Sequence, residues 1–205
     1  MSELGPGLLP VGRVQGVHVG AADGSGRSSA HHIEQPRSAS TRRPSQSRLS
    51  PVDLSAIVLE AADERRRLGL PDGVELRTAA VPTLQLVGDR ARLRELLSIM
   101  LDNAVTYTRA GEIFLSVRSD GVDAIIRVTD TGIGIPADEL TRVFERFHRA
   151  GNVREETIRG SGLGLTIARS IAHAHRGTIE AFATGDPGTT FIVRLPLARR
   201  NRSAG

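Results

Sequence analysis

One apolar stripe constrains this chain more than any other feature of its sequence. Between Arg92 and Thr108 the apolar residues recur at helical spacing, and at 100° per residue they share one face about 140° wide. They are Leu93, Leu96, Leu97, Met100, Leu101 and Ala104. A helix with so wide an apolar face must pack against another layer of apolar side chains. The segments around it therefore have to supply that layer.

The flanking segments predict a sheet. Alternating or short apolar runs predict strands at 74–78, 83–87, 113–118, 124–130, 178–184 and 189–195. Helical spacing predicts further helices at 53–68, from Pro136 to about Phe147, and at 163–174. Strands that follow one another in hairpins, with helices between them, indicate the α/β class. We expect a two-layer α/β sandwich, a mixed and mostly antiparallel sheet with helices on one face.

The two ends of the chain differ from its body. Residues 1–50 are rich in Gly, Ser, Pro and Arg without a lasting period, so we expect them to be disordered. The folded domain is expected at 51–197, and a basic tail at 198–205. The positive charge lies in both ends, which favours solvated tails over a nucleic-acid surface. Aromatic residues are only 3% of the chain, so no nucleic-acid partner is expected.

Composition also excludes several kinds of chemistry. The chain has no cysteine and no lysine, so thiol catalysis, Schiff-base chemistry and a lysine-containing P-loop are excluded. No apolar run approaches the roughly 20 residues of a membrane-spanning helix, and no signal peptide is visible. We therefore expect a cytoplasmic protein without a direct membrane segment. Any nucleotide phosphates would have to be bound by backbone amides, a metal ion and arginine.

Two polar residues stand at the borders of apolar patterns. Asn103 lies at the edge of the helical stripe, and its amide oxygen is a hard ligand suited to Mg²⁺. Asp130 ends a row of core-facing strand residues, where a carboxylate needs a donor such as an adenine amino group. Each residue also has a simpler interpretation, because Asn103 could bond locally and Asp130 could cap a turn.

Two glycine-rich segments follow. Gly160, Gly162 and Gly164 lead into the helix at 163–174, whose first amides could bind an anion. The segment 185–189 is by itself a hairpin turn. Three glycines alone are a weak signal.

Taken together, in this order, these segments resemble the ATP-binding catalytic domain of sensor histidine kinases, which has the Bergerat fold. The resemblance covers about 52–197. It rests on five motifs, which are LeuAspAsnAla at 101–104, AspThrGlyIleGlyIle at 130–135, PheGluArgPhe at 144–147, GlySerGlyLeuGlyLeu at 160–165 and GlyThrThrPhe at 188–191.

The resemblance implies that ATP and Mg²⁺ bind here. Asn103 would hold the metal, Asp130 would accept from adenine, and Arg146 or Arg149 would lie near the γ-phosphate. The other nucleotide-binding positions that it implies are Tyr107, Gly132, Gly134, Gly160, Gly162, Leu163, Gly164 and Thr189. Residues 148–161 would be the mobile lid, and both Phe144 and Phe147 would pack at its base.

Two departures from the family pattern matter. Ile99 replaces the usual Asn four residues before Asn103, and Thr106 replaces the usual cation three residues after it. We expect Arg109 to compensate in part for the missing cation. The loss of one charged hydrogen bond costs about 1.5–3 kcal/mol, roughly ten- to a hundredfold in affinity.

The resemblance implies transfer of the ATP γ-phosphoryl to a histidine. His32 lies in polar sequence too close to the ATP-binding region to belong to a helical hairpin. We therefore expect the acceptor histidine on a dimerisation domain in trans, a response regulator as an indirect partner, and a monomer for the chain alone.

Two other functions stay open. The first is a non-catalytic nucleotide-binding docking module, which Ile99 and Thr106 favour. The second is an anti-sigma-factor-type serine kinase, against which PheGluArgPhe weighs.

Overall fold

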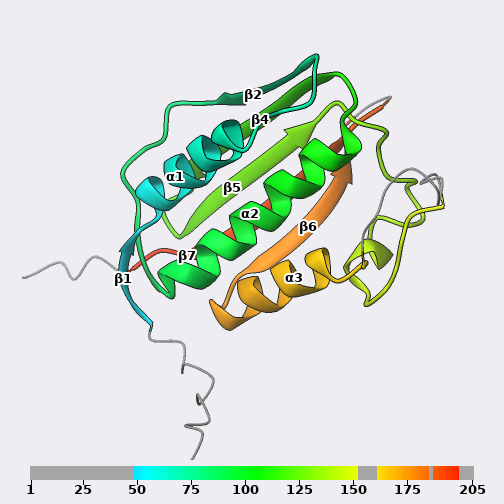
Figure 1. The fold of residues 1–205 in the computed structure, drawn as a ribbon. Coiled ribbons are helices and arrows are strands. Elements are labelled where there is room, and N and C mark those ends of the chain that lie inside the picture. The colour runs from blue at the N-terminus through cyan, green and yellow to red at the C-terminus, as the bar shows by residue number, and fades with distance from the viewer. Residues whose placement is uncertain (1–48, 152–160, 185–186, 199–205) are drawn as a thin grey trace, which may run out of the picture. The chain divides into compact units, whose positions relative to one another are not determined.

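A five-stranded sheet carries three helices on one face (Figure 1). The structure is a computed structural model that describes residues 49–151, 161–184 and 187–198. The strand order is β2-β4-β5-β7-β6, where β2 spans Val74–Thr78, β4 Gly111–Ser119, β5 Asp123–Asp130, β7 Thr189–Pro196 and β6 Thr178–Ala183. Strand β2 is parallel to β4, and the other neighbours are antiparallel. The predicted α/β class and the mixed, mostly antiparallel sheet are confirmed.

Aspartates cap the first turns of two of the helices. In α1, Leu54–Arg67, the Asp53 carboxylate accepts from the amides of Ser55 and Ala56. In α2, Arg90–Tyr107, Asp89 caps the first turn in the same way. These side chains satisfy amides that have no partner within the helix. Helix α3 spans Gly164–Ala174 and has no side-chain cap.

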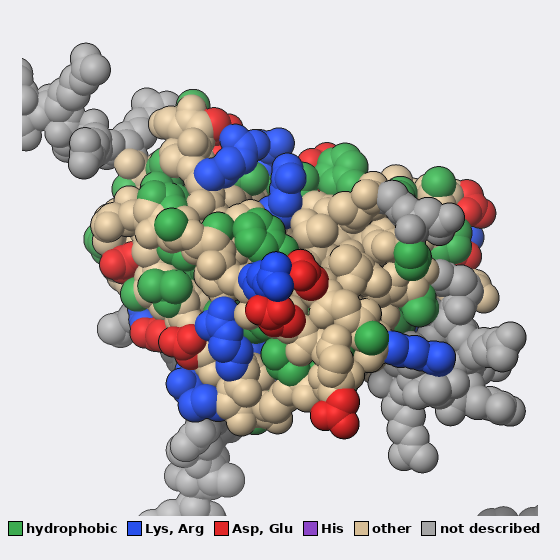
Figure 2. Space-filling view, turned by 90° about the horizontal axis from the view of Figure 1, so that it is seen from above, with side chains coloured by type: hydrophobic (Ala, Val, Ile, Leu, Met, Phe, Trp, Pro, Cys, Tyr) green, Lys and Arg blue, Asp and Glu red, His purple; other side chains and the backbone are tan. Residues whose placement is uncertain are grey.

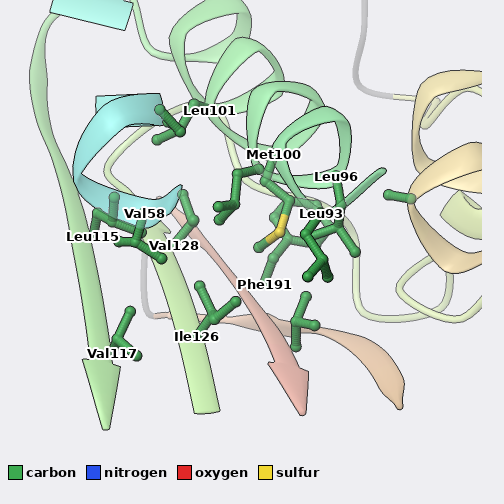
Figure 3. Packing of buried hydrophobic residues seen from close by; sticks show 14 of the residues in the cluster. Val58, Leu93, Leu96, Met100, Leu101, Leu115, Val117, Ile126, Val128 and Phe191 are labelled. Carbon is green, nitrogen blue, oxygen red and sulfur yellow. The ribbon is translucent and has the colours of Figure 1, made fainter. Parts of the chain in front are cut away.

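The core lies between the helical layer and the sheet. All six residues of the predicted stripe on α2 are at most 1% exposed. Figure 3 shows several of them directed at strand residues such as Val128 and Phe191. The stripe that the sequence predicted is therefore the contact between the layers.

One expected helix does not form. Residues from Pro136 to Phe147 fold as turns on either side of η1, a single 3₁₀ turn at Arg142–Phe144. At Glu145 the backbone becomes extended, with ψ 151°. Phe144 lies edge-on to Phe191 of β7, with ring centroids 6.3 Å apart. One apolar turn is too short to propagate a helix, so this tertiary contact decides the local structure.

A short strand was not predicted. Strand β1, Ser50–Asp53, pairs antiparallel with β3, Gln85–Gly88, beside the main sheet. Ser50 therefore belongs to a strand, although the sequence placed it in the N-terminal segment. The rest of that segment, at 1–48, lies outside the described residues, as do 199–205. Among the described residues, no helix is long and apolar enough to cross a membrane.

Candidate functional site

Two adjoining pockets form a cleft at the C-terminal end of α2. The larger pocket has a volume of ≈ 290 Å³ and is bounded by Ile99, Asp102, Asn103, Thr106, Tyr107, Val143, His148, Arg149, Ser161, Gly162, Gly164 and Leu165. The smaller pocket has a volume of ≈ 60 Å³ and is bounded by Asn103, Tyr107, Asp130, Gly134, Ile135, Val143, His148, Arg149, Ala150, Leu165, Thr189 and Phe191. Because they share six lining residues, the two pockets form one continuous cleft.

Helix α2 contributes a polar edge to the cleft. Its lining residues stand at positions 99, 102, 103, 106 and 107, which lie on one helical face. Asn103 is half-buried and lines both pockets. The departures noted in the sequence also lie here, because Ile99 and Thr106 both face the larger pocket. Helix α2 thus lines both pockets, and Asp102 is the charged side chain among these five residues.

Asp130 lies at the base of the smaller pocket. It is 4% exposed, and its Oδ1 accepts a hydrogen bond of 3.0 Å from the Gly132 amide. Burial raises the pKa of this carboxyl, while backbone hydrogen bonds from Gly132 and Thr189 oppose the rise. A buried carboxylate beside an apolar cavity can bind a ligand that presents a donor, such as an amino group.

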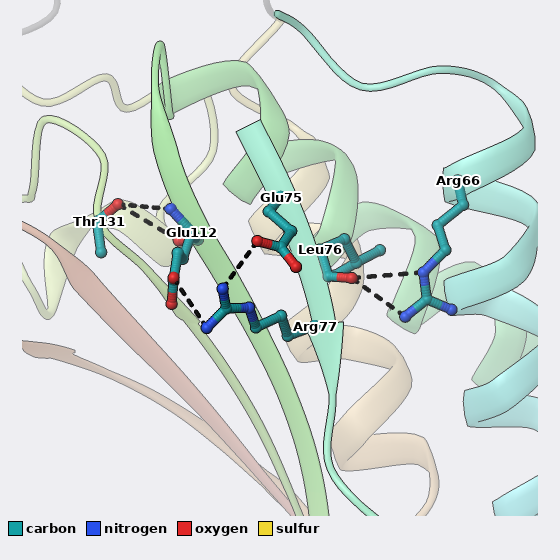
Figure 4. A network of polar contacts seen from close by, with 6 residues as sticks. All are labelled: Arg66, Glu75, Leu76, Arg77, Glu112 and Thr131. Atoms are coloured by element: carbon teal, nitrogen blue, oxygen red, sulfur yellow. Dashed lines mark hydrogen bonds and ion pairs between the residues drawn. The ribbon is translucent and has the colours of Figure 1, made fainter. Parts of the chain in front are cut away.

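The turn after β5 joins Asp130 to α2. The amide of Ile133 donates to the carbonyl of Tyr107 at 3.1 Å. At the other side, the Glu112 amide donates to Thr131 Oγ1 at 2.9 Å, and this hydroxyl donates to the Glu112 carbonyl at 3.4 Å (Figure 4). The Thr131 amide donates to the same carbonyl. Tyr107 and Asp130, which are distant in sequence, are brought together by these backbone contacts.

Strand β7 closes the smaller pocket. Thr189 pairs with Asp130 across the sheet and is 3% exposed. A Cβ on the preceding Gly188 would lie 2.6 Å from the Asp130 carbonyl oxygen, and its φ is +156°. Only glycine allows this close approach. The GlyThrThrPhe segment is therefore part of the cleft, beyond its role as a hairpin turn.

The start of α3 borders the larger pocket. Gly162 has φ +66°, and a Cβ there would lie 2.9 Å from the backbone of Phe147. The Phe147 amide donates to the Gly162 carbonyl at 3.1 Å. This contact joins the PheGluArgPhe segment to the helix start, whose first turn lacks a side-chain cap. Its amide groups therefore suit an anion.

The predicted residues do not all line the cleft. Asn103, Tyr107, Asp130, Gly134, Arg149, Gly162, Gly164 and Thr189 line it. Gly132 and Leu163 support it, the first through Asp130 and the second as the residue before α3. Arg146 and Arg109 are exposed and line neither pocket. Gly160 lies outside the described residues, as does most of the expected lid.

Sequence reasoning missed three kinds of lining residue. The apolar walls come from Ile135, Val143, Leu165 and Phe191, and Asp102 adds a carboxylate. His148 lines both pockets, and its buried Nε2 has no hydrogen-bond partner among the described residues. Its place directly after PheGluArgPhe was the available signal. Phe144 is buried, but Phe147 is 71% exposed, so only the first of these two packs as expected.

No described group of three or more His, Cys, Asp and Glu side chains could hold a metal ion by itself. A divalent cation in this cleft would need oxygen ligands from a bound nucleotide besides Asn103. An amide oxygen is a suitable ligand for Mg²⁺, which commonly binds through one or two protein groups and phosphates. The residues present therefore fit a nucleotide-bound magnesium ion.

The fold and the cleft define an α/β ATP-binding domain. A family model described as "Histidine kinase-, DNA gyrase B-, and HSP90-like ATPase" matches residues 88–199. The chain belongs to this family. The sensor-like histidine kinase SenX3 of Mycobacterium tuberculosis is 37% identical over 149 residues, which are 72% of this chain and 36% of SenX3.

Solved structures agree. The mycobacterial sensor histidine kinase MprB is 30% identical with a TM-score of 0.65, over 72% of this chain and 98% of that one. ShkA in complex with AMPPNP is also 30% identical, with a TM-score of 0.61, over 73% of this chain and 31% of that one. The matched region is the ATP-binding catalytic domain of a histidine kinase. The chain spans about a third of the length of SenX3.

Proposed function

We propose that this domain binds Mg²⁺-ATP in the cleft and transfers the γ-phosphoryl group to a histidine on a separate dimerisation domain. One observation carries the proposal. The buried carboxylate of Asp130 lines the smaller pocket, the start of α3 lines the larger one, and Asn103 lines both. The buried carboxylate suits the amino group of adenine, and the amides at the helix start suit a polyphosphate.

Each end has a distinct task. Asp130 accepts a hydrogen bond from the adenine amino group, and Tyr107, Gly134 and Thr189 enclose the base. At the other end Gly162 and Gly164 allow the phosphates to approach the first amides of α3, and Arg149 faces their negative charge. Magnesium, held by Asn103 and the phosphates, would neutralise charge that develops during transfer.

The transfer itself needs little covalent chemistry from this chain. A neutral imidazole nitrogen of the acceptor attacks the γ-phosphorus, the bond from that phosphorus to the β–γ bridging oxygen breaks, and ADP leaves. The imidazole proton passes to water. The domain contributes position and charge compensation, which supply most of the catalysis of phosphoryl transfer. A response regulator would receive the group later, and the domain alone would be a monomer.

The deciding experiment is calorimetric titration with ATP, in Mg²⁺ and in chelator. We expect binding that depends on Mg²⁺ and weakens about tenfold or more in Asn103→Ala, because a metal ligand is lost. Gln85→Ala, an exposed change on β3, is the control. Incubation with a dimerisation domain should then give an acid-labile phosphohistidine. No binding at millimolar ATP would contradict the proposal.

A docking module is the second candidate. Ile99 and Thr106 both face the larger pocket, and Ile99 Cγ2 lies 3.3 Å from where a Cβ on Gly164 would stand. Ile99 therefore places an apolar side chain at the edge where the family usually has a polar residue. ATP binding without transfer to any dimerisation domain would support this candidate.

A further inference from the structure

Asp102 places a negative charge where the proposed function needs to bind phosphates. Its side chain is 52% exposed and lines the larger pocket next to Asn103. Ser98 Oγ donates to its Oδ2 at 3.3 Å. An uncompensated carboxylate at this position would repel a polyphosphate.

An arginine from another helix compensates this charge. Nη1 of Arg65, in α1, lies 2.9 Å from Asp102 Oδ1. Its Nη2 donates to the Gly69 carbonyl at 2.6 Å, and the side chain is only 17% exposed. Both ends of the guanidinium are therefore held, so the cation has a fixed place behind the carboxylate.

The other ion pairs between α1 and α2 provide a contrast. Arg90 pairs with Glu60 at 2.6 Å, and Arg94 pairs with Glu64 at 3.1 Å. Arginine and acidic side chains lie next to one another on the face that Figure 2 shows. Of the acidic partners in the three pairs, only Asp102 lines the cleft. The arginines of the other two pairs are both more exposed than Arg65. The pair of Arg65 and Asp102 thus differs from pairs that only join two helices.

We propose that Arg65 is a positioning residue that neutralises Asp102 and so makes the larger pocket selective for a polyphosphate. This inference rests on the proposed nucleotide-binding function. Arg65 touches no nucleotide in this arrangement and acts only through Asp102. It follows that the affinity for phosphates depends on the position of α1, whereas the affinity for the base does not.

A double-mutant cycle tests the proposal. Dissociation constants of ATP and adenosine are measured for the wild type, Arg65→Met, Asp102→Asn and the double variant, in chelator and in Mg²⁺. We expect Arg65→Met to weaken ATP binding about three- to tenfold, more in chelator than in Mg²⁺, and to leave adenosine unchanged. Asp102→Asn should tighten ATP binding about two- to threefold, and the double variant should return to within about twofold of the wild type.

Arg94→Met is the matched control, because it breaks an ion pair between the same helices away from the cleft. It should leave the ratio of ATP to adenosine affinity unchanged. Equal weakening of ATP and adenosine in Arg65→Met would overturn the inference, as would weaker Mg²⁺-ATP binding in Asp102→Asn. Asp102 is exposed, so its variant keeps the test valid if Arg65→Met fails to fold. If the wild type binds ATP, either of these two outcomes overturns the inference alone and leaves the proposed function standing. If the wild type does not bind ATP, both the inference and the proposed function are overturned.

Discussion

The two pockets of the cleft are built in different ways. The smaller pocket is fixed by backbone contacts, since Asp130 is held by Gly132 and Thr189, and Ile133 donates to Tyr107. The larger pocket is formed by side chains on α2 and by the start of α3. It departs from the family pattern at Ile99 and Thr106.

This difference indicates which pocket has the more strictly fixed geometry. A pocket held by the backbone tolerates few substitutions, because its donors and acceptors have fixed directions. A pocket held by side chains changes its affinity with single substitutions. We therefore expect base recognition to depend on one residue, and phosphate recognition to be spread over several.

The largest effect is expected at Asp130. Asp130→Asn removes the charged acceptor proposed for the adenine amino group, so ATP and adenosine should both bind about ten- to a hundredfold more weakly in calorimetry. Stability should respond differently. Burial raises the pKa of Asp130 in the folded state, so the wild type loses stability as pH rises from the unfolded pKa through the folded one.

The variant lacks this ionisation. The stability of Asp130→Asn relative to that of the wild type should therefore increase from about pH 4 to neutral pH. Urea denaturation at several pH values measures this difference. If this relative stability falls as pH rises, the folded protein favours the ionised form of Asp130. The smaller pocket would then not be the apolar site that the comparison assumes.

Local periodic patterns in the sequence predicted the core well, whereas contacts between distant segments did not follow from them. The α2 stripe and the row that ends at Asp130 are local periodic patterns, and both are confirmed as parts of the core. The turn region at 136–147 was wrongly predicted, because packing of Phe144 on Phe191 outweighs local propensity. Strand β1 pairs with β3, and Asp102 pairs with Arg65 of another helix, so neither contact followed from a local pattern.

A medium effect is expected from Arg149. This residue lines both pockets, whereas Arg146 is exposed and lines neither, although both stood as candidates near the γ-phosphate. Arg149→Met should weaken ATP binding about tenfold, because a charged contact to phosphate is lost. Arg146→Met is the matched control and should change ATP affinity less than about twofold. The reverse order in the same titrations would assign the phosphate contact to Arg146.

The smallest effect is expected at Ile99, and it has the opposite sign. Ile99→Asn replaces a half-buried apolar side chain beside Gly164 with the amide usual in the family. One added neutral hydrogen bond should tighten ATP binding about two- to tenfold and leave adenosine unchanged. The lost apolar contact should lower stability by about 1 kcal/mol or less, since the side chain is only partly buried. Ile99→Val keeps the site apolar and serves as the control. If Ile99→Asn binds ATP more weakly than Ile99→Val, the contact of Ile99 with α3 supports the phosphate end, and Ile99 is a stabilising part of the larger pocket rather than a defect in it.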